Sequence, residues 1–218
     1  MIYKNKKELI GTLVNSKDTI LDVGFWGQGQ TIDNPKWPHR FILEKAGGAY
    51  TYGLDVDFDE GKLGKINDIS HYKKGSAEDF QISLKFDVIF AADLIEHLSN
   101  PGLFLKSCRD NLKDGGSLVI TTPNCFSLFN IAEKLTKTEP TVNSDHTMYF
   151  NSKTLRTLFA KNDWSIVSMD YLYSLDTGYV ESWKKKFLNA IYHALSWYTP
   201  KYIETLVIVA KPDNLAKG

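Results

Sequence analysis

Apolar and polar residues alternate along this chain with two distinct periods. Short apolar runs are typical of buried strands, and longer segments with an apolar residue every three or four positions are typical of helices with one buried face. Strands are predicted at 19–24, 49–57, 85–94, 117–124, 164–175 and 203–212, and helices at 6–15, 37–48, 100–116 and 151–163. Strands that alternate with helices predict an α/β fold, in which helices cover both faces of a parallel sheet.

Residues at the ends of two predicted helices support their boundaries. Asn100 and Pro101 are typical of a helix start, and the glycine pair at 115–116 is typical of a helix end. Asn151 or Ser152 is the expected N-cap of the last predicted helix.

The segment at about 179–200 interrupts the alternation just before the last predicted strand. It has the pattern of one helix, with lysines at 184–186 and an apolar face that includes Trp183 and Phe187. Such a helix either packs against the sheet or a second subunit, or covers an acceptor site or meets a lipid-linked substrate. We expect a single domain over 1–218 with this segment as a helical insertion.

The composition is that of an ordinary globular protein of 218 residues, enough for one α/β domain. The net charge is zero, so no nucleic acid is expected as a partner. Cys108 and Cys125 have neither metal-binding nor redox spacing, so we expect both thiols to be reduced and the protein to be cytoplasmic. We also expect a monomer or homodimer. No apolar run reaches the roughly 18 residues of a membrane span, which leaves only peripheral membrane contact open.

The stretch ILDVGFWGQGQ at 20–30 joins a predicted strand to a glycine-rich turn. Gly24, Gly27 and Gly29 let the backbone approach a ligand closely, because no Cβ intervenes. The next strand ends near Asp55, whose carboxylate can accept hydrogen bonds from both hydroxyls of a ribose. This arrangement suits the pyrophosphate of a dinucleotide or the carboxylate of a bound amino-acid group, and a tight turn without a ligand gives the same pattern.

The segment 85–124 and the later segment 145–167 resemble class I S-adenosylmethionine-dependent methyltransferases. The pieces of the first segment that carry the resemblance are FDVIF at 86–90, LIEHL at 94–98, LKDGG at 112–116 and SLVITTPN at 117–124. The similarity covers roughly 18–172 and points to small-molecule enzymes of ubiquinone biosynthesis and sugar modification. It implies a Rossmann-like, mostly parallel seven-stranded sheet with helices on both faces and a C-terminal antiparallel strand.

The resemblance also implies S-adenosylmethionine as the cofactor and a set of residues that bind it. Asp22 and Gly24 match the first motif and flank the methionine part, while Asp55 binds the ribose. Ser76 stands where the family usually has an acid beside the adenine. The full set is Asp22, Gly24, Phe25, Gly27, Gly29, Asp55, Val56, Ala77, Glu78, Ala91, Ala92 and Asp93.

The glycine turn matches the family motif only if one residue, Phe25 or Trp26, is inserted. The inserted ring either lies against the cofactor or the acceptor pocket, or points into the core and props the turn. Backbone carbonyls at 91–93 are expected to hold the methionine ammonium.

Methyl transfer to a hydroxyl or ammonium group requires a base that removes a proton. The candidate catalytic residues are Asp93, His97 and His146. Asp93 lies at the end of the third predicted strand, His97 lies four residues later, and His146 lies on the loop before the last predicted helix, at the cofactor side of the sheet. Each histidine also has an interpretation without a catalytic role. His97 can pack beside the cofactor, and His146 can form only local hydrogen bonds. Glu96 is expected to cap or pair locally. No His, Asp or Glu cluster has ligand spacing, so no metal site is predicted, and a magnesium-assisted mechanism stays open without support from the sequence.

We therefore expect a methyltransferase that acts on oxygen or nitrogen of a small-molecule acceptor, such as a sugar, a lipid-linked metabolite or an aromatic metabolite. Aromatic residues in the variable segments favour an apolar or ring-bearing acceptor: Trp37, Phe126, Phe129, Tyr149, Tyr179 and Trp183. One alternative is a non-catalytic cofactor-binding domain, which the altered first motif and Ser76 favour. The other is a nicotinamide-dependent oxidoreductase, although the G-x-G-x-x-G spacing is missing.

Overall fold

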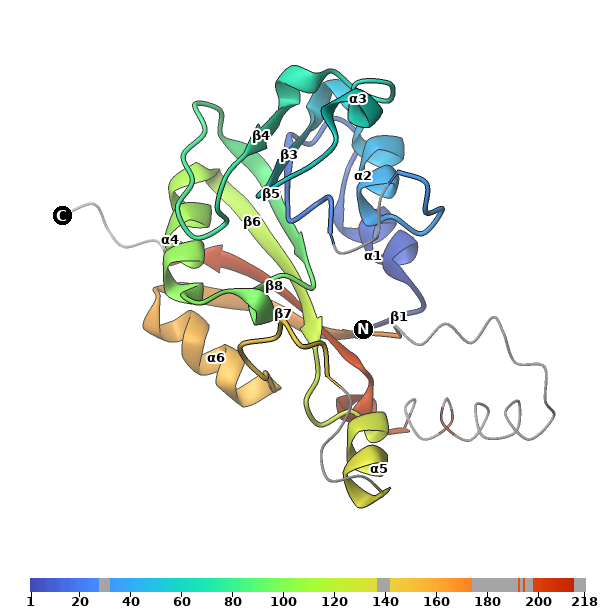
Figure 1. Ribbon diagram of the computed structural model, residues 1–218. Helices are drawn as coiled ribbons and strands as arrows, with labels where there is room; N and C mark the ends of the chain where they lie inside the picture. Colours follow the sequence, from blue (N-terminus) through green and yellow to red (C-terminus); the bar gives the residue numbers. More distant parts are fainter. Residues whose placement is uncertain (28–31, 137–141, 174–191, 193, 195–197, 214–218) are drawn as a thin grey trace.

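A central sheet separates two groups of helices in the computed structural model (Figure 1). The structure describes residues 1–27, 32–136, 142–173, 192, 194 and 198–213. Its strands are β1 (Ile2–Tyr3), β2 (Ile20–Val23), β3 (Thr51–Asp55), β4 (Tyr72–Lys74), β5 (Phe86–Ala92), β6 (Leu112–Pro123), β7 (Trp164–Leu172) and β8 (Thr205–Pro212). Its helices are α1 (Lys6–Leu13), α2 (Pro38–Ala46), α3 (Glu60–Leu63), α4 (Pro101–Asn111), α5 (Leu128–Thr136) and α6 (Ser152–Lys161), with 3-10 turns η1 (Gly48–Tyr50), η2 (Ile69–His71), η3 (Ile95–His97) and η4 (Pro200–Tyr202).

The strands form one eight-stranded sheet in the order β1-β7-β8-β6-β5-β2-β3-β4. Neighbouring strands are parallel, except that β8 runs antiparallel to both β6 and β7. In the dinucleotide-binding fold, whose strand order is 3-2-1-4-5-6, the last two strands are neighbours in the sheet. The corresponding strands here are β6 and β7, and the reversed β8 lies between them. The mostly parallel sheet with a C-terminal antiparallel strand is confirmed, and the two-residue β1 adds an edge strand that the periodicity did not predict.

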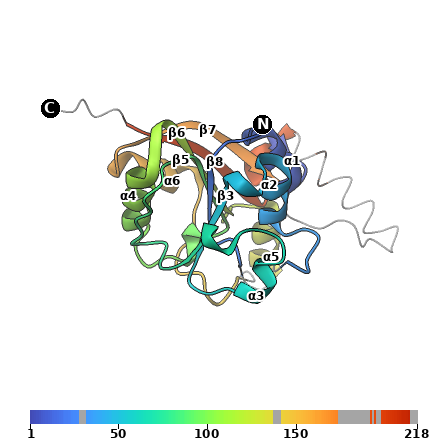
Figure 2. The ribbon, with the colours of Figure 1, turned by 90° about the horizontal axis from the view of Figure 1, so that it is seen from above.

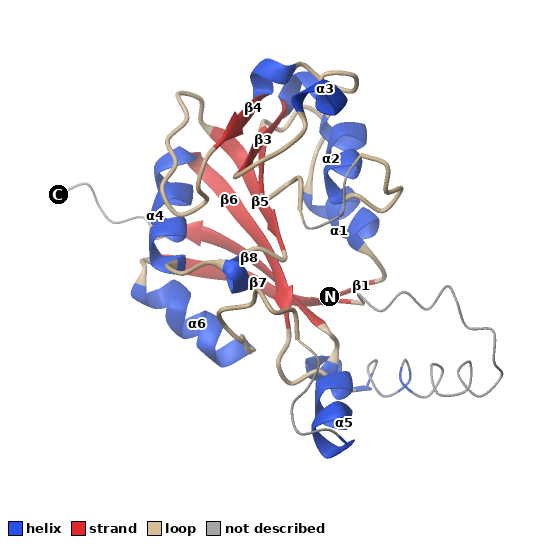
Figure 3. Ribbon diagram, viewed as in Figure 1, coloured by secondary structure: helices blue, strands red, loops and turns tan. Residues whose placement is uncertain are grey.

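The period of two along the central strands decides which helices cover each face. Leu21 and Ile89 are fully buried against α4 and α6, while their neighbours Ile20 and Phe90 are fully buried on the side of α1 and α2. Figures 2 and 3 show the same separation, with α1 and α2 on one side of the sheet and α4 and α6 on the other. Both faces are therefore covered, as the apolar runs predicted.

Helix α4 begins where the sequence predicts and ends earlier. The side chain of its N-cap, Asn100, accepts a hydrogen bond from the backbone N–H of Leu103. The helix ends at Asn111 rather than at the glycine pair, because Leu112 already pairs with Phe86 of β5. The glycines lie inside β6, where Gly115 has a positive φ of 79°.

Two helices were not expected, and the structure decides the N-cap of a third. The short α3 and the amphipathic α5 were not predicted. The N-cap of α6 is Asn151, whose side chain accepts hydrogen bonds from the backbone N–H groups of Lys153 and Thr154. The predicted helical insertion at 179–200 lies largely outside the described residues. Within the described residues of the whole chain, no helix is long and apolar enough to cross a membrane.

The carboxyl ends of β2, β3, β5 and β6 meet at one edge of the sheet, because these strands run parallel. The chain that leaves β2 continues to α2 on one face, and the chain that leaves β5 continues to α4 on the other. In open α/β sheets, ligands bind where neighbouring connections diverge in this way. The fold therefore places a binding site above the ends of β2 and β5.

Candidate active site

A cavity of about 670 Å³ opens at this edge of the sheet. The predicted site residues Asp22, Gly24, Asp55, Asp93, His97 and His146 all line it. They come from the ends of β2, β3 and β5 and from the loop before α6. The fold brings them together because the carboxyl ends of parallel strands share one edge.

A second cavity of about 310 Å³ lies beside the first. The residues that line both are Gly24, Asp55, Val56, Leu94 and His97. The second cavity is also lined by 75–78, the segment expected beside the adenine. The carboxylate of Glu78 anchors the start of α4, since it accepts hydrogen bonds from the backbone N–H groups of Ser99 (2.6 Å) and Asn100 (2.9 Å). The two adjoining cavities suit an elongated ligand with two different ends.

The glycine turn is held by the carboxylate at the end of the next strand. Oδ2 of Asp55 accepts hydrogen bonds from the backbone N–H groups of Trp26 (2.9 Å) and Gly27 (3.4 Å). Gly24 and Gly27 have positive φ angles of 75° and 57°, a conformation that a residue with a Cβ rarely adopts. One oxygen of Asp55 thus shapes the turn, and the same side chain lines both cavities.

The two candidates for the inserted residue, Phe25 and Trp26, take different places. Phe25 is buried, and its ring lies near those of Trp37, Phe58 and Tyr72, with centroids 6.4, 5.4 and 5.1 Å away. Indole Nε1–H of Trp37 donates to the carbonyl of Phe25 at 2.6 Å. Phe25 lines the cavity but mainly props the turn, while the half-buried Trp26 lines the cavity beside it.

Behind the glycine turn, the carboxylate of Asp22 is bonded to a buried histidine. Oδ2 of Asp22 lies 2.9 Å from Nδ1 of His39, and Nε2 of His39 lies 2.9 Å from the hydroxyl of Tyr72. Burial raises the pKa of Asp22 above its ordinary value, and the hydrogen bond from His39 offsets only part of this rise. This buried polar chain was not predicted from the sequence.

On the other wall of the cavity, Asp93 adopts a left-handed backbone with a φ of 49°. Its carboxylate accepts hydrogen bonds from the ammonium of Lys6 at 2.6 Å and from the hydroxyl of Thr121 at 2.7 Å. Burial opposes ionisation of Asp93, but Lys6 and Thr121 outweigh it and hold its pKa below the usual value. Asp93 is therefore an anion that already has its own cation.

Glu96 follows Asp93 at the start of η3 and is almost fully buried. Its Oε2 accepts a hydrogen bond from the hydroxyl of Thr122 at 2.9 Å, while Oε1 has no hydrogen-bond partner among the described residues. Burial, together with the nearby charge of Asp93, raises the pKa of Glu96 to about 8. The local pairing predicted for Glu96 is present at one oxygen, and the other oxygen has no such partner among the described residues.

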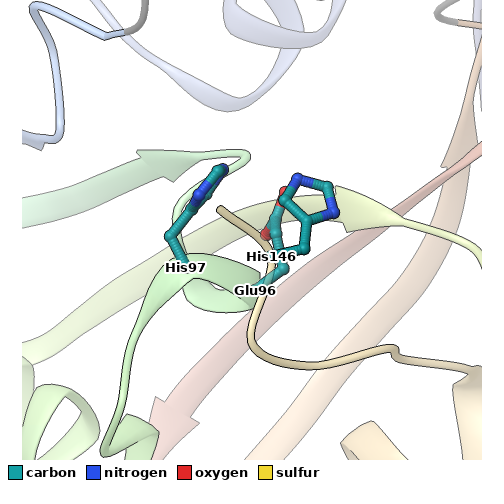
Figure 4. A group of neighbouring side chains, drawn as sticks. All are labelled: Glu96, His97 and His146. Atoms are coloured by element: carbon teal, nitrogen blue, oxygen red, sulfur yellow. The ribbon is translucent and has the colours of Figure 1, made fainter. Parts of the chain in front are cut away.

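His97 and His146 lie beside Glu96, as Figure 4 shows. One ligand atom from each of the three side chains lies within 4.8 Å of the other two, a spacing that a metal ion could bridge. The loop that carries His146 is tied to η3, because Thr147 donates from its backbone N–H to the carbonyl of Glu96 at 2.9 Å. Burial lowers the pKa of His146, and His97 lowers it further, so the neutral imidazole is favoured.

Other residues of the predicted cofactor set line one of the two cavities. Val56 and Ala92 line the large cavity, and Ala77 lines the small one. The side chain of Ala91 is fully buried in the core, and Ala91 lines neither cavity, so the part predicted for its backbone carbonyl stays a prediction. Gly29 lies outside the described residues.

Sequence reasoning missed Lys6 as a site residue and Glu96 as a member of a possible metal cluster. Lys6 belongs to an ordinary amphipathic helix, and no sequence signal distinguishes it. Glu96 and His97 are adjacent in sequence, but His146 joins them only through the packing of a distant loop. Of the aromatic residues proposed for the acceptor pocket, Trp37 lines the cavity, while Phe126 and Tyr149 are exposed elsewhere.

Comparison with known families and sequences gives consistent matches. Residues 13–169 match the sequence model of a family described as a methyltransferase domain. An ubiquinone biosynthesis O-methyltransferase of Nitrobacter winogradskyi is 38% identical over 82 residues, 35% of this chain and 31% of that protein. A mitochondrial ubiquinone biosynthesis O-methyltransferase of Rattus norvegicus is 26% identical over 125 residues, 55% of this chain and 36% of that protein. The chain matches about a third of the length of these curated relatives.

Solved structures show the same fold. A methyltransferase from Archaeoglobus fulgidus superimposes with a TM-score of 0.54 at 18% identity, covering 94% of each chain. The 1,6-didemethyltoxoflavin-N1-methyltransferase of Burkholderia thailandensis, solved with bound 1,6-didemethyltoxoflavin and S-adenosylhomocysteine, gives a TM-score of 0.60 at 11% identity, covering 96% of this chain and 77% of the other. The class I methyltransferase fold implied by the sequence resemblance is confirmed.

Proposed function

We propose that this chain, which belongs to the methyltransferase domain family, transfers a methyl group from S-adenosylmethionine to a hydroxyl group of a small molecule. One observation carries the proposal. A single cavity joins the motif residues Asp22, Gly24 and Asp55 to the cluster of Glu96 and the two histidines, His97 and His146. The first group suits a cofactor, and the second suits the activation of an acceptor.

The residues present fit S-adenosylmethionine. The small cavity offers a place for the adenine beside 75–78, and Asp55 lies at the junction of both cavities, where a ribose would bind. The carboxylate of Asp22 lines the large cavity and suits the cofactor's ammonium. When bound, this cofactor supplies an electrophilic methyl group with a neutral leaving thioether.

Alignment of the acceptor is the main contribution expected from the protein. Holding two reactants in line can lower a barrier by about 7–11 kcal/mol, so the shape of the cavity matters more than any single charge. Trp26 and Trp37 contribute apolar walls on one side, and His97 and His146 contribute polar walls on the other. This division suits an acceptor with an apolar body and a reactive hydroxyl.

The hydroxyl must also lose its proton. The neutral imidazole of His146 could accept it directly. Alternatively, Glu96, His97 and His146 could hold a divalent cation, which lowers the pKa of a nearby hydroxyl. The free Oε1 of buried Glu96 favours the cation, because a carboxylate oxygen without a partner is costly unless a ligand satisfies it. Two imidazoles and one carboxylate suit Mn²⁺ or Zn²⁺ better than Mg²⁺.

Methyl transfer can be measured with S-adenosylmethionine labelled in its methyl group and a panel of catechols, phenols and sugar nucleotides. We expect label in a phenolic or catecholic product, and a large loss of kcat in Glu96→Gln and His146→Asn. The affinity for S-adenosylhomocysteine should stay within about twofold in both variants, because neither residue is placed at the cofactor. Tight cofactor binding without transfer to any acceptor in a metabolite extract would favour the non-catalytic alternative.

The cation can be tested separately by calorimetric titration with MnCl₂ and ZnCl₂ after treatment with EDTA. We expect one bound ion in the wild type and none in Glu96→Gln, with His71→Asn as a control because His71 lies outside the cluster. Full turnover by the metal-free protein would instead assign the proton transfer to His146. A cytoplasmic location, a monomer or homodimer and a single domain over 1–218 stay predictions.

A further inference from the structure

A chain of buried hydrogen bonds leads from the loop before β4 to the floor of the large cavity. Nδ2 of Asn67 donates to the hydroxyl of Tyr72 at 3.0 Å, and this hydroxyl lies 2.9 Å from Nε2 of His39. Nδ1 of His39 lies 2.9 Å from Oδ2 of Asp22, and the side chains of His39 and Asp22 are 0% and 3% exposed. None of the proposed steps of methyl transfer uses His39 or Tyr72.

The network assigns the direction of each hydrogen bond. The amide nitrogen of Asn67 faces the carbonyl oxygens of Gly48 and Thr51 at 3.2 and 3.3 Å, so its orientation is set, and it can only donate to Tyr72. The hydroxyl hydrogen of Tyr72 cannot go to that nitrogen and therefore points to Nε2 of His39. Nε2 is then the acceptor, and the imidazole carries its proton on Nδ1, facing Asp22.

This tautomer has a consequence for the charge of Asp22. A neutral imidazole that donates from Nδ1 stabilises the carboxylate without cancelling its negative charge. A protonated imidazole would cancel it and would leave the Tyr72 hydroxyl hydrogen without its acceptor. The other charged groups that act on Asp22 are Asp55 at the end of β3 and Lys6 on α1.

We infer that His39 and Tyr72 are positioning residues, which hold Asp22 as an oriented anion for the ammonium group of the cofactor's methionine part. The inference rests on the proposed function, because it takes S-adenosylmethionine as the ligand of the large cavity. His39 reaches Asp22 from α2, the first helix after the glycine turn in sequence. The helix that follows the turn therefore supports the motif carboxylate.

Ring packing alone does not account for His39. Its imidazole lies 4.9 Å from the ring of Phe25 and 5.0 Å from that of Trp37, in a setting where an apolar side chain would pack well. A buried imidazole without partners would be unfavourable there, and both of its nitrogens are instead hydrogen-bonded, one to Asp22 and one to Tyr72. The polarity is thus directed at Asp22.

The test compares two ligands that share the adenosine part. S-adenosylhomocysteine carries the ammonium group, and 5′-methylthioadenosine lacks the whole amino-acid part. We expect His39→Leu to weaken S-adenosylhomocysteine about tenfold or more and to leave 5′-methylthioadenosine within about twofold. His39→Asn, whose amide nitrogen can replace Nδ1, should restore most of the affinity. Tyr72→Phe should give a smaller loss with the same selectivity.

The matched control is His71→Asn, which removes a different half-buried histidine. His71 bonds to the carbonyl of Gly48 and has no bond to Asp22. This substitution should leave the affinity for both ligands unchanged. Parallel weakening of both ligands by His39→Leu would overturn the inference and make His39 a packing residue. If the wild type binds neither ligand, the proposed function fails instead, so the two failures are distinguishable.

A measurement on the unliganded wild type keeps the inference testable should His39→Leu fail to fold. In the protein with ¹⁵N-labelled histidine, two-bond ¹H–¹⁵N correlation spectra report the tautomer of each imidazole. We expect His39 to be neutral and protonated on Nδ1 at pH 7. Protonation on Nε2, or on both nitrogens, would contradict the hydrogen-bond directions on which the inference depends.

Discussion

The ammonium of Lys6, in the first helix, lies 2.6 Å from Oδ2 of Asp93, at the end of β5. The two residues are 87 positions apart in sequence, and the pair closes one wall of the large cavity. The lysine side chain is 19% exposed and the aspartate side chain 38%, so water weakens their attraction only in part. The positive charge of Lys6 therefore offsets the negative charge of Asp93, one of the two carboxyl groups beside the histidine pair; the other belongs to Glu96.

Replacing this lysine should strengthen cation binding. In Lys6→Met, the carboxylate of Asp93 loses its own cation and adds negative potential beside Glu96, so Mn²⁺ should bind tighter by about 1 kcal/mol, roughly fivefold. Calorimetric titration measures the change, and Lys7→Met is the control, because Lys7 is 68% exposed and pairs with Glu44. Unchanged or weaker binding in Lys6→Met would show that Lys6 does not oppose a cation here.

Glu96 should make the stability of the protein depend on pH. Its carboxyl keeps its proton in the folded protein up to a pKa of about 8, while the unfolded chain releases it near 4.5. Between these values the unfolded state binds fewer protons, so the free energy of unfolding falls as the pH rises. In Glu96→Gln this fall is absent, and the variant should exceed the wild type by a few kcal/mol at pH 9.

Urea unfolding in EDTA from pH 4 to pH 9 measures this difference. The two proteins should be similar near pH 4, where Glu96 is protonated in both states of the wild type. Asp79→Asn is the control, since Asp79 is exposed. A Glu96→Gln variant that is less stable than the wild type at pH 9 would show that the charged carboxylate has a stabilising partner.

A pair of glycine substitutions tests the packing under the glycine turn. A Cβ at Gly53 would lie 2.6 Å from Cδ1 of Tyr72 and 2.7 Å from Cδ1 of Phe25, so Gly53→Ala should cost about 1–3 kcal/mol of stability. Gly11 lies inside α1 with nothing within 4 Å of its added Cβ, so Gly11→Ala should add about 0.5–1 kcal/mol. Thermal unfolding of both variants checks the two signs, and a neutral Gly53→Ala would mean that the aromatic cluster can move aside.

Phe25 and Trp26 should respond differently to truncation. Phe25→Ala removes a buried ring and should lower the free energy of unfolding by about 3–5 kcal/mol. Trp26 is only half-buried and lines the cavity, so Trp26→Ala should mainly weaken ligand binding. Comparing the unfolding midpoint with the dissociation constant for S-adenosylhomocysteine separates the two effects. If Trp26→Ala changed neither quantity, its ring would have no part in binding.

The sequence predicted the strands and long helices well because their apolar periods match the two covered faces of the sheet. It also predicted that Asp22, Asp55 and Asp93 would meet, because each lies near the carboxyl end of a strand and these ends share one edge of the sheet. It could not predict the end of α4, which depends on where Leu112 pairs with β5. Strand pairing is a tertiary property and overrides the local preference of the following glycines.

Contacts between distant loops were equally invisible in the sequence. His146 reaches Glu96 only because Thr147 bonds to η3, and His39 reaches Asp22 only because α2 packs behind the glycine turn. Neither contact leaves a local pattern in the sequence. The sequence predicted His97 and His146 as candidate catalytic residues, but only the fold shows that Glu96 lies with them.

The central claim is that the two adjoining cavities bind S-adenosylmethionine, and calorimetric titration with S-adenosylhomocysteine and with NAD tests it most directly. We expect one S-adenosylhomocysteine per chain with a micromolar dissociation constant and no NAD binding. Asp55→Asn, which keeps an oxygen for the glycine turn and loses the charge, should weaken S-adenosylhomocysteine about tenfold, while the exposed Asp79→Asn should not. Binding of NAD alone, or no binding of S-adenosylhomocysteine at millimolar concentration, would contradict the account.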